Sequence, residues 1–366
     1  MFCRMGEPIG RPLFRASVLI AMVQKETDTF KKVLFPIETM TTKTKSRVLL
    51  FILSQENLPL SLLELKTTLH ITHHHRNGEV VIAAVPQLMQ KRIPRLACTK
   101  KAFEILFEAP VELLEESLES YSWKKIYKKN FCVRAPGSGN EAKYGGRVWR
   151  SLKREKIKPK VNLDHPDLLI EIFIKDGWAI VCRGRWENGG GFKERRSHLT
   201  PGHHPTTMNP KFARTLVNLA DASTIRDPFC GSGGIITEAC LIGLRARGSD
   251  IDRGMIIRAQ KNLQHAKIAK SKYSVTVKDA TKIKSLTNIV TDLPYGKSSK
   301  MSSDIMNLYA AFIKNITGNA VIVFPDFVDF KIVLRKHLKK SLIVKHIISH
   351  YVHKSLTRYI VVIKKK

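Results

Sequence analysis

The stretch Ile225-Arg-Asp-Pro-Phe-Cys-Gly-Ser-Gly-Gly-Ile-Ile-Thr-Glu-Ala239 decides the fold of the second half of this chain. Asp227 ends a predicted strand, the glycines Gly231, Gly233 and Gly234 form a turn, and an amphipathic helix comes next. Glycines let a backbone approach a ligand closely, and the first N–H groups of a helix are free to bind it. A dinucleotide fold would instead show G-x-G-x-x-G, with a pyrophosphate over the helix. Because Asp227 adds an anion here, the turn favours a cationic, amino-acid-bearing ligand.

Carboxylates also end the next three predicted strands. These strands cover residues 245–249, 274–278 and 288–291, and the acidic residues after them are Asp250 (with Asp252 two positions on), Asp279 and Asp292. A carboxylate roughly 20 residues after such a turn can bind both hydroxyls of a ribose, and Asp279 could accept a hydrogen bond from an adenine amino group. Apolar strands alternate with helical patterns through to Val362, which predicts a wound α/β sheet. Since open α/β sheets bind ligands at the carboxyl ends of their strands, four acidic strand ends indicate one site.

Length and composition exclude several classes of protein. The chain has 366 residues, 63 of them Lys or Arg and 31 Asp or Glu, which gives a formal charge of +32. This length predicts two or three domains, and a hydrophobic content of 43% excludes wholesale disorder. The longest apolar run near the start, Val18 to Val23, is far shorter than the roughly 20 residues that span a bilayer, so no membrane association is expected.

The excess of cations is spread over the whole chain. Residues 1–196 hold 35 basic and 21 acidic residues, and residues 197–366 hold 28 and 10. Such a balance favours a phosphate polyanion as partner, although a generic basic surface of a ribosome-adjacent or highly soluble protein is the alternative. None of the six cysteines forms a C-x-x-C pair, so neither a zinc ribbon nor a disulfide framework is indicated. The cysteine pattern fits a reducing, cytoplasmic compartment.

The first half reads as a compact α+β region. A strand is predicted over 47–53, a helix over 58–69, a helical stretch within 98–120, a strand over 131–135, and a hairpin around Lys175-Asp-Gly177. Residues 1–39 differ from the rest of the chain, because they carry several prolines and show no sustained periodicity. They are interpreted as an extension or a mis-called start before Met40; a targeting peptide is the weaker alternative, since Glu7, Glu26 and Asp28 interrupt it.

A basic helix is predicted between residues 143 and 160, where eight cations face only Glu155. Arg150, Lys153, Arg154 and Lys158 would share one face, next to Trp149. A solvated cationic face is the structural alternative, but the net charge favours contact with a nucleic acid. The predicted RNA-binding residues are Lys143, Arg147, Arg150, Lys153, Arg154 and Lys158.

The residues quoted so far resemble the class I methyltransferases that use S-adenosylmethionine, and more narrowly the THUMP-domain RNA methyltransferases. Asp292-Leu-Pro-Tyr295 is similar to the D/N-P-P-Y motif of enzymes that methylate exocyclic amino nitrogens. Leu293 departs from that motif, but D-L-P-Y-G variants occur in archaeal tRNA guanine-10 N2-methyltransferases. The segments 196–219 and 353–358 are also similar to that branch, and the resemblance covers nearly everything from Met40 onward.

The resemblance implies a domain order as well as an activity. It divides the chain into an N-terminal ferredoxin-like domain (40–120), a looser THUMP-like RNA-binding domain (121–185), a linker (186–200) and a Rossmann-like methyltransferase domain (201–366). The expected reaction is methylation of the N2 amino group of a tRNA guanosine, preferentially at position 10, once or twice. The implied partners are S-adenosylmethionine and tRNA; a small activator subunit stays open, and otherwise a monomer is expected.

The resemblance also implies roles for single residues. Asp227, Phe229, Gly231 and Gly233 would line the methionine end of the cofactor, Asp250 (or Asp252) would hold the ribose, and Asp279 the adenine. At the other side, Asp292 and a main-chain carbonyl at Leu293 or Pro294 would accept the N–H bonds of the guanine amino group, and Tyr295 would stack on the base. A packed loop aromatic is the alternative for Tyr295.

The sequence also leaves rival interpretations. The rival substrates are a guanosine at tRNA position 6, a ribosomal RNA guanosine or a DNA adenine, and the rival class is a catalytically inactive tRNA-binding adaptor. His198, His203, His204 and the run His73 to His75 lack cysteine or carboxylate partners at ligand spacing, so no metal is expected. Cys230 is predicted to be a small buried side chain, since no activating base lies near it in sequence.

Overall fold

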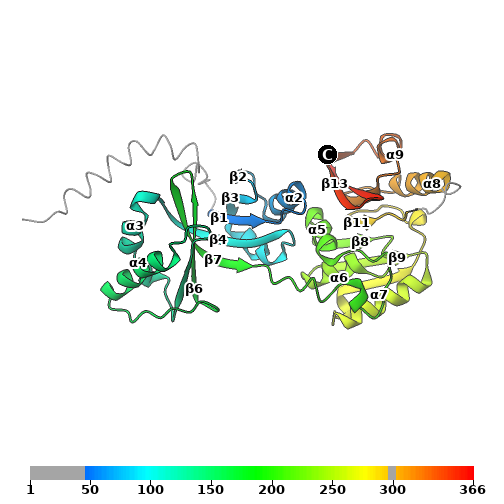
Figure 1. Cartoon of the computed structure of the whole chain (residues 1–366). Helices are drawn as coiled ribbons and strands as arrows, with labels where there is room; N and C mark the ends of the chain where they lie inside the picture. Colours follow the sequence, from blue (N-terminus) through cyan, green and yellow to red (C-terminus); the bar gives the residue numbers. More distant parts are fainter. Residues whose placement is uncertain (1–45, 296–301) are drawn as a thin grey trace, which may run out of the picture.

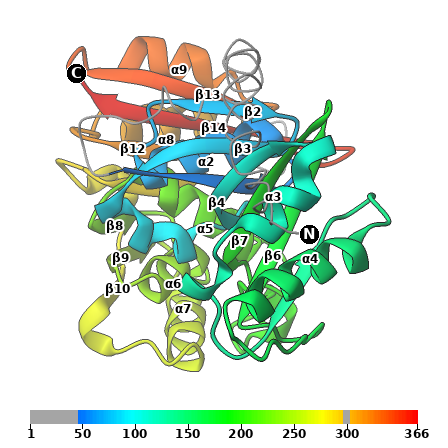
Figure 2. The same ribbon diagram turned by 90° about the vertical axis from the view of Figure 1, so that its left-hand side faces the viewer.

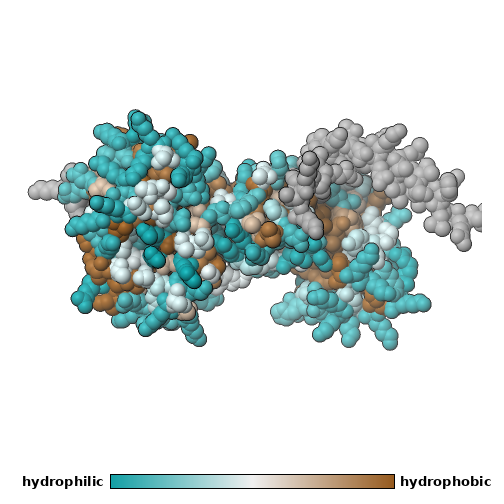
Figure 3. Space-filling view, turned by 180° about the vertical axis from the view of Figure 1, so that it is seen from behind, coloured by the Kyte–Doolittle hydropathy of each residue, from teal (hydrophilic) through white to brown (hydrophobic). Residues whose placement is uncertain are grey.

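The computed structural model describes residues 46–295 and 302–366, so the predictions on residues 1–39 lie outside the described part. The described chain forms two lobes that are consecutive in sequence (Figure 1), and the molecule narrows between them in the space-filling view (Figure 3). Among the described residues, no helix has the length and apolar character needed to cross a bilayer.

The first lobe is built on one seven-stranded sheet in the order β2-β3-β1-β4-β7-β6-β5. All neighbouring strands are antiparallel except β5 and β6, which are parallel. Its elements are β1 (Ser46–Leu53), α2 (Leu58–Leu69), β2 (His74–Asn77), β3 (Val80–Pro86), the 3-10 helix η2 (Gln87–Arg95), β4 (Thr99–Pro110), α3 (Leu114–Ser120), β5 (Phe131–Arg134), α4 (Glu141–Arg154), β6 (Leu168–Lys175) and β7 (Trp178–Glu187). Because β4 pairs with both β1 and β7, the sheet runs without a break through the regions predicted as ferredoxin-like and THUMP-like.

Local sequence explains several of these elements. The predicted strand at 47–53 and helix at 58–69 are confirmed as β1 and α2, and Asn57 caps α2 by accepting a hydrogen bond from the Leu60 N–H at 3.1 Å. The predicted hairpin is confirmed as β6 and β7. Asp176 and Gly177, with φ of 50° and 78°, form the two-residue turn that matches strand twist.

In this lobe one prediction is confirmed over a shorter stretch and another needs correction. The helical stretch predicted within 98–120 is confined to α3, because residues 99–110 form β4, where Phe103 is buried opposite Leu50 of β1 and Gly184 of β7. An apolar run of this kind fits either a helix or a strand by periodicity alone, and here pairing with β1 and β7 makes it a strand. The basic helix α4 ends at Arg154, because Lys156 has a φ of 61°, so Lys158 lies beyond the helix and does not share its face.

The second lobe is a wound sheet in the order β10-β9-β8-β11-β12-β14-β13. The strands β8 to β12 are parallel, and β14 lies antiparallel between β12 and β13. Its elements are α5 (Pro210–Ala220), β8 (Thr224–Asp227), α6 (Gly234–Leu241), β9 (Arg245–Asp250), α7 (Arg253–His265), β10 (Tyr273–Val277), β11 (Ile289–Asp292), α8 (Ser302–Ile313), β12 (Ala320–Pro325), α9 (Phe330–His337), β13 (Leu342–His353) and β14 (Leu356–Lys365). The strand order reverses between β8 and β11, which is where such sheets bind ligands.

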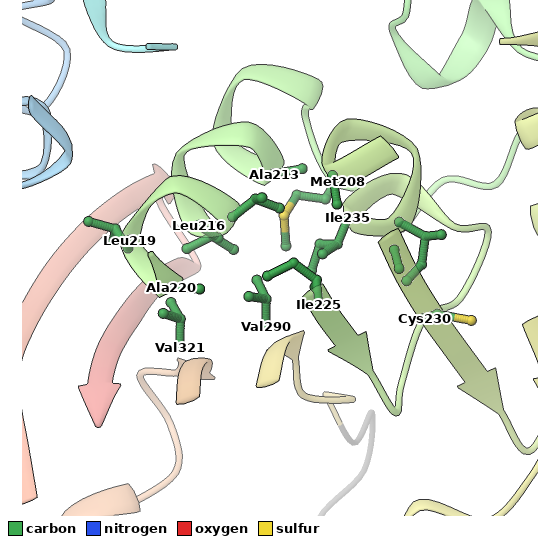
Figure 4. Close-up of a cluster of buried hydrophobic side chains, with 14 of the residues drawn as sticks. Met208, Ala213, Leu216, Leu219, Ala220, Ile225, Cys230, Ile235, Val290 and Val321 are labelled. Carbon is green, nitrogen blue, oxygen red and sulfur yellow. The ribbon is translucent and has the colours of Figure 1, made fainter. Parts of the chain in front are cut away.

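Helices cover both faces of this sheet. One face is packed by α5, α6 and α7, whose buried side chains surround Ile225, Val290 and Val321 of the sheet (Figure 4). The other face is packed by α8 and α9 against Ile322 and Phe324. Adjacent β12 residues thus point to opposite cores, as expected of a strand buried on both faces. The predicted α/β fold class is confirmed.

Helix α2 of the first lobe packs on α5 of the second, and the two helices lie side by side where the lobes meet (Figure 1). In the turned view the first lobe lies in front of the second (Figure 2). Glu64 on α2 is fully buried and accepts hydrogen bonds from the Ala97 and Cys98 N–H groups and from Asn218 Nδ2 on α5 at 2.7 Å. Nearby, Asp221 accepts from Arg92 and lies 2.8 Å from His70 Nε2. Buried hydrogen bonds between two packed elements disfavour other arrangements, so these contacts set how the lobes sit together.

Candidate active site

The glycine turn after β8 has the geometry that its sequence predicts. Gly231 and Gly233 have φ of 51° and 85°, in the left-handed region where a side chain is strained. A Cβ on Gly233 would lie 3.0 Å from the Ala259 Cβ, whereas the space above Gly231 is open. Gly233 therefore allows α6 to pack on α7, and Gly231 leaves room for a ligand.

Asp227 ends β8 beneath this turn, and its side chain is buried. Its Oδ1 accepts hydrogen bonds from the Phe229 N–H at 3.2 Å and from Thr291 Oγ1 at 2.7 Å. Burial raises the pKa of Asp227 to about 7, with the carboxylates of Asp250 and Asp292 adding to the rise. A desolvated carboxyl group of this kind becomes fully ionised when a cation binds beside it.

The next strand end also carries carboxylates toward the same edge of the sheet. Asp250 accepts from the Gly231 N–H at 2.8 Å and from the Asp252 N–H at 3.0 Å, so it ties the glycine turn to β9. Asp252 is exposed and caps α7 through the Gly254 N–H at 2.6 Å. This capping role makes Asp250 the better placed of the two for a ribose.

Asp279 comes after β10, and Phe229 lies in the turn after β8. Asp279 accepts hydrogen bonds from the Thr281 N–H and hydroxyl, which lower its pKa. Phe229 contacts Phe312 of α8 edge to face, with the ring centroids 5.1 Å apart. Its ring is therefore partly buried against the core under α8, while its N–H donates to Asp227.

Asp292 ends β11, next to β8, and begins the D-L-P-Y segment. Its Oδ1 accepts a hydrogen bond from the Tyr295 hydroxyl at 2.5 Å, and its Oδ2 lies 3.5 Å from Arg358 Nη2. Burial raises the pKa of Asp292, while Arg358 and the Tyr295 hydroxyl oppose the rise. The preceding residue, Thr291, donates a hydrogen bond to Asp227. Asp227, the predicted cofactor-binding carboxylate, is therefore hydrogen-bonded to the residue next to Asp292, the predicted catalytic carboxylate.

The Leu293-Pro294 peptides are held from two sides. The Leu293 N–H donates to the Val323 carbonyl at 3.1 Å, and the buried Tyr309 hydroxyl of α8 donates to the Pro294 carbonyl at 2.8 Å. Tyr309 is a residue that sequence reasoning missed, since α8 carries no motif. Thr291 was also missed, although its place directly before Asp292 was a usable signal.

Arg358 on β14 is the third residue that sequence reasoning left without a role, although the segment 353–358 was singled out. Its guanidinium carbon lies 5.6 Å from the ring centroid of Tyr295 and 5.7 Å from that of Phe212. Its side chain is 14% exposed, and its buried Nε has no hydrogen-bond partner among the described residues. Within the described part of the chain, Arg358 thus brings a cation that lies over two aromatic rings against the carboxylate of Asp292.

The structure also bears on the residues that were set aside. Cys230 is buried, and burial beside Asp227 and Asp250 raises the pKa of its thiol, so it stays protonated and packs against Gly248. Within the described residues, no group of histidine, cysteine and carboxylate side chains could hold a metal ion.

The predicted RNA-binding cations lie on or just after α4, but several of them are paired. Lys143 and Arg147 form ion pairs with Glu115 of α3, and Arg147 and Arg150 lie 2.8 and 3.5 Å from Glu119. Arg154 donates to the Glu119 carbonyl. Among the described residues, Lys153 and Lys158 have no carboxylate partner. The α4 cations therefore divide into a set that joins α4 to α3 and a set that faces solvent.

The strand order, the antiparallel β14 and the carboxylates at four strand ends define a Rossmann-like class I methyltransferase domain. The family model described as "RMKL-like, methyltransferase domain" matches residues 197–358. A tRNA (guanine(10)-N2)-dimethyltransferase of Methanothermobacter thermautotrophicus is 29% identical over 339 residues, which cover 87% of this chain and 99% of that protein. One of Pyrococcus abyssi is 32% identical over 260 residues, covering 65% and 74%.

These relatives identify the family. The chain belongs to the family of tRNA (guanine(10)-N2)-dimethyltransferases, as the sequence motifs predicted. Among solved structures, TrmN from Thermus thermophilus is similar over 87% of this chain and all of that one, with a TM-score of 0.49 and 17% identity.

Proposed function

We propose that this protein transfers methyl groups from S-adenosylmethionine to the exocyclic N2 of a tRNA guanosine, most favourably at position 10, to give N2-methyl- and N2,N2-dimethylguanosine. The observation that carries the proposal is the contact of Asp227 with Thr291, directly before Asp292. It brings a carboxylate suited to a cationic amino acid next to a carboxylate suited to an amino group of a base, at the point where the sheet reverses its strand order.

The residues fit S-adenosylmethionine, which supplies an electrophilic methyl group on a sulfonium. Asp227 would ionise beside the amino group of the methionine end, because its pKa of about 7 falls when a cation is adjacent. The open space above Gly231 would admit the cofactor, Asp250 would hold the ribose hydroxyls, and Asp279 the adenine amino group. Asp250 already orients the Gly231 N–H, so binding needs little rearrangement of the turn.

On the guanine side, the lone pair of N2 is delocalised into the ring, which makes the amino group a poor nucleophile. Asp292 would accept one N–H bond, and the Pro294 carbonyl, held by Tyr309, would accept the other. These two acceptors localise the lone pair and aim it at the methyl group. The base must leave its stack to reach them, and the Tyr295 ring would then stack on it, worth roughly 1–3 kcal/mol.

A second transfer needs only one acceptor. N2-methylguanine keeps a single N–H bond, which Asp292 can accept while the first methyl group takes the other direction. The proton released in each transfer passes to Asp292 or to water, so Asp292 does not have to be a strong base. Dimethylation then depends on space near Pro294, which is exposed beside the buried Leu293.

The test is methyl transfer from labelled S-adenosylmethionine to unmodified tRNA transcripts, followed by nuclease digestion and nucleoside mass spectrometry. The expected products are N2-methyl- and N2,N2-dimethylguanosine at position 10. Label at position 6, or in ribosomal RNA alone, would keep the proposed reaction but change the substrate nucleotide. No label, together with no thermal shift on adding S-adenosylhomocysteine, would favour an inactive tRNA-binding adaptor.

We further propose that the protein acts in the cytoplasm and, unless it needs a small activator subunit, as a monomer. A requirement for a small activator subunit would show as activity that appears only when a cell extract is added to the purified protein. Activity of the purified chain alone would exclude that requirement.

A further inference from the structure

The described residues enclose a cavity of about 890 Å³ between the two lobes. Its walls come from the start of α2, the segment 97–101, the linker 187–196, the start of α5 and the end of β13. None of the residues proposed to hold the cofactor lines it. Its volume lies near the upper end of the range of about 300–1,000 Å³ that is typical of small-molecule sites, which leaves room for a nucleotide.

The lining of the cavity is basic. It carries six Lys or Arg side chains and three Glu side chains. Glu56 is paired with Lys211 at 2.6 Å, and Glu187 lies 4.0 Å from Lys101. In contrast, Lys100, Lys193 and Arg196 are exposed and have no carboxylate within ion-pair distance among the described residues. Glu194, the third carboxylate of the lining, is likewise exposed and has no ion pair with a described residue. Three unpaired cations against one unpaired carboxylate still suit a phosphate group.

Aromatic rings stand beside these cations. Phe212 and His350 are stacked, with their centroids 4.3 Å apart and an angle of 13° between the rings. Burial, together with Arg358, lowers the pKa of His350, so its ring is neutral at pH 7. Tyr351, which also lines the cavity, is 66% exposed. Phe212 is buried, so Tyr351 is the ring of this set that presents an exposed face. An exposed aromatic ring in the same cavity as unpaired cations is a feature with which proteins bind single-stranded nucleic acid.

Arg358 connects this cavity to the active site. It lines the cavity, its plane lies over Phe212, and its Nη2 is 3.5 Å from Asp292. The side chain of Arg358 therefore lies between the cavity and Asp292, the carboxylate that would hold the target base. The buried Nε of Arg358, which has no partner among the described residues, is an unused donor in this wall.

We propose that this interlobe cavity binds the nucleotide adjacent to the target guanosine in the same RNA strand, with its phosphate at Lys100, Lys193 and Arg196 and its base against Tyr351. The inference rests on the proposed function, since it takes Asp292 as the site of the flipped base. It adds a second RNA-binding site, separate from α4, which would hold the strand open at the point where the target base leaves its stack.

Photo-crosslinking tests this site without requiring turnover. A tRNA with 4-thiouridine at either neighbour of position 10 is irradiated with the full-length protein and S-adenosylhomocysteine, and the crosslinked peptides are identified by mass spectrometry. The expected crosslinks fall in residues 187–196 or 350–352. Crosslinks confined to α4, or to any segment outside the cavity, would overturn the proposal.

A triple variant, Lys100→Ala, Lys193→Ala and Arg196→Ala, provides a second measurement. It should weaken tRNA binding about tenfold at physiological salt and reduce the dependence of log K on log salt by about three. The matched control removes the same charge at exposed positions outside the cavity, with Lys336→Ala, Lys339→Ala and Lys340→Ala. Equal losses in the two variants would show a general charge effect and no site.

The two proposals fail in different ways. If the wild-type protein methylates no tRNA, the proposed function fails. If it methylates tRNA while the crosslinks and the triple variant contradict the cavity, only the cavity site fails.

Discussion

Charged side chains meet in two regions of this protein, and the regions are built in opposite ways. On α3 and α4, Glu115 and Glu119 each pair with more than one cation, so each of these two carboxylates has its partners within the chain. At the ends of β8, β9 and β11, the carboxylates of Asp250 and Asp292 lie close enough to raise the pKa of Asp227, and among the described residues Arg358 pairs with Asp292 alone. In a chain with a charge of +32, such a local excess of anions is typical of a site for a cationic ligand.

The largest effect is expected from Asp292→Asn, which keeps the shape of the side chain and removes its charge. Loss of one oriented acceptor at a reacting group typically costs on the order of 10²–10³ in kcat. Binding of tRNA and of S-adenosylhomocysteine should stay within about twofold, because neither is assigned to this carboxylate alone. Steady-state kinetics and calorimetry measure both. Asp176→Asn in the β6–β7 turn is the control, and wild-type kcat in Asp292→Asn would contradict the assigned role.

Asp227 should make cofactor binding depend on pH. Its carboxyl group has a pKa of about 7 in the free protein and must be ionised to bind a cation. The Kd for S-adenosylhomocysteine should therefore rise by roughly tenfold per pH unit below about pH 6.5 and level off above about pH 8. Calorimetry across this pH range measures it. A flat profile, or the same slope in Asp227→Asn, would remove Asp227 from the cofactor site.

The same carboxyl group should cost stability in the free protein. Because its folded-state pKa is raised, the stabilising protonated form is fully present below pH 3.8 and is lost as pH rises through about 7. At about pH 8, the free energy of unfolding of Asp227→Asn should therefore exceed that of the wild type by about 1–3 kcal/mol, and the variant should unfold at a higher temperature. Thermal unfolding at that pH checks this. An equal gain at a pH near 4 would point to a cause other than ionisation.

Arg358 should act on Asp292 through its charge. Arg358 lowers the pKa of Asp292, so Arg358→Gln should shift the acidic limb of the kcat profile to higher pH. Arg358→Lys should restore the limb but leave kcat about tenfold low, because an ammonium group does not stack between Tyr295 and Phe212. Arg335→Gln on the exposed side of α9 is the control. A loss of kcat without any shift of the limb would reduce Arg358 to a packing role.

The smallest effects are expected on α4, and they should separate its two sets of cations. Lys153→Ala and Lys158→Ala should each reduce the salt dependence of tRNA binding by about one. Arg147→Ala should leave that slope unchanged and lower the unfolding temperature instead, because Arg147 joins α4 to α3. Filter binding at several salt concentrations and thermal unfolding distinguish the two. An unchanged slope in all three variants would place the RNA surface elsewhere.

The contrast between the two regions also shows which features of the structure can be predicted from local sequence patterns and which cannot. The acidic strand ends and the glycine turn are local patterns, and all of them lie where the wound sheet was expected to place them. Arg358 approaches Asp292 only because β14 is inserted next to β12, and no local pattern reports that strand order. The pairing of Arg147 with Glu115 was missed for the same reason, since α3 and α4 meet through tertiary packing. The end of α4 depends on the left-handed conformation of Lys156, which its residue type does not signal.

The buried Glu64 has a consequence for how this protein can be recombined. Its carboxylate lies in one lobe and accepts a hydrogen bond from Asn218 in the other, and burial raises its pKa. Loss of Asn218 would leave this buried acid with only the N–H groups of Ala97 and Cys98 from its own lobe. A chimera that joins this first lobe to the second lobe of a relative would have to carry both residues, or neither. The two lobes are thus matched to each other across this interface, and the distance from the first lobe to Asp292 changes only when both sides of the interface change together.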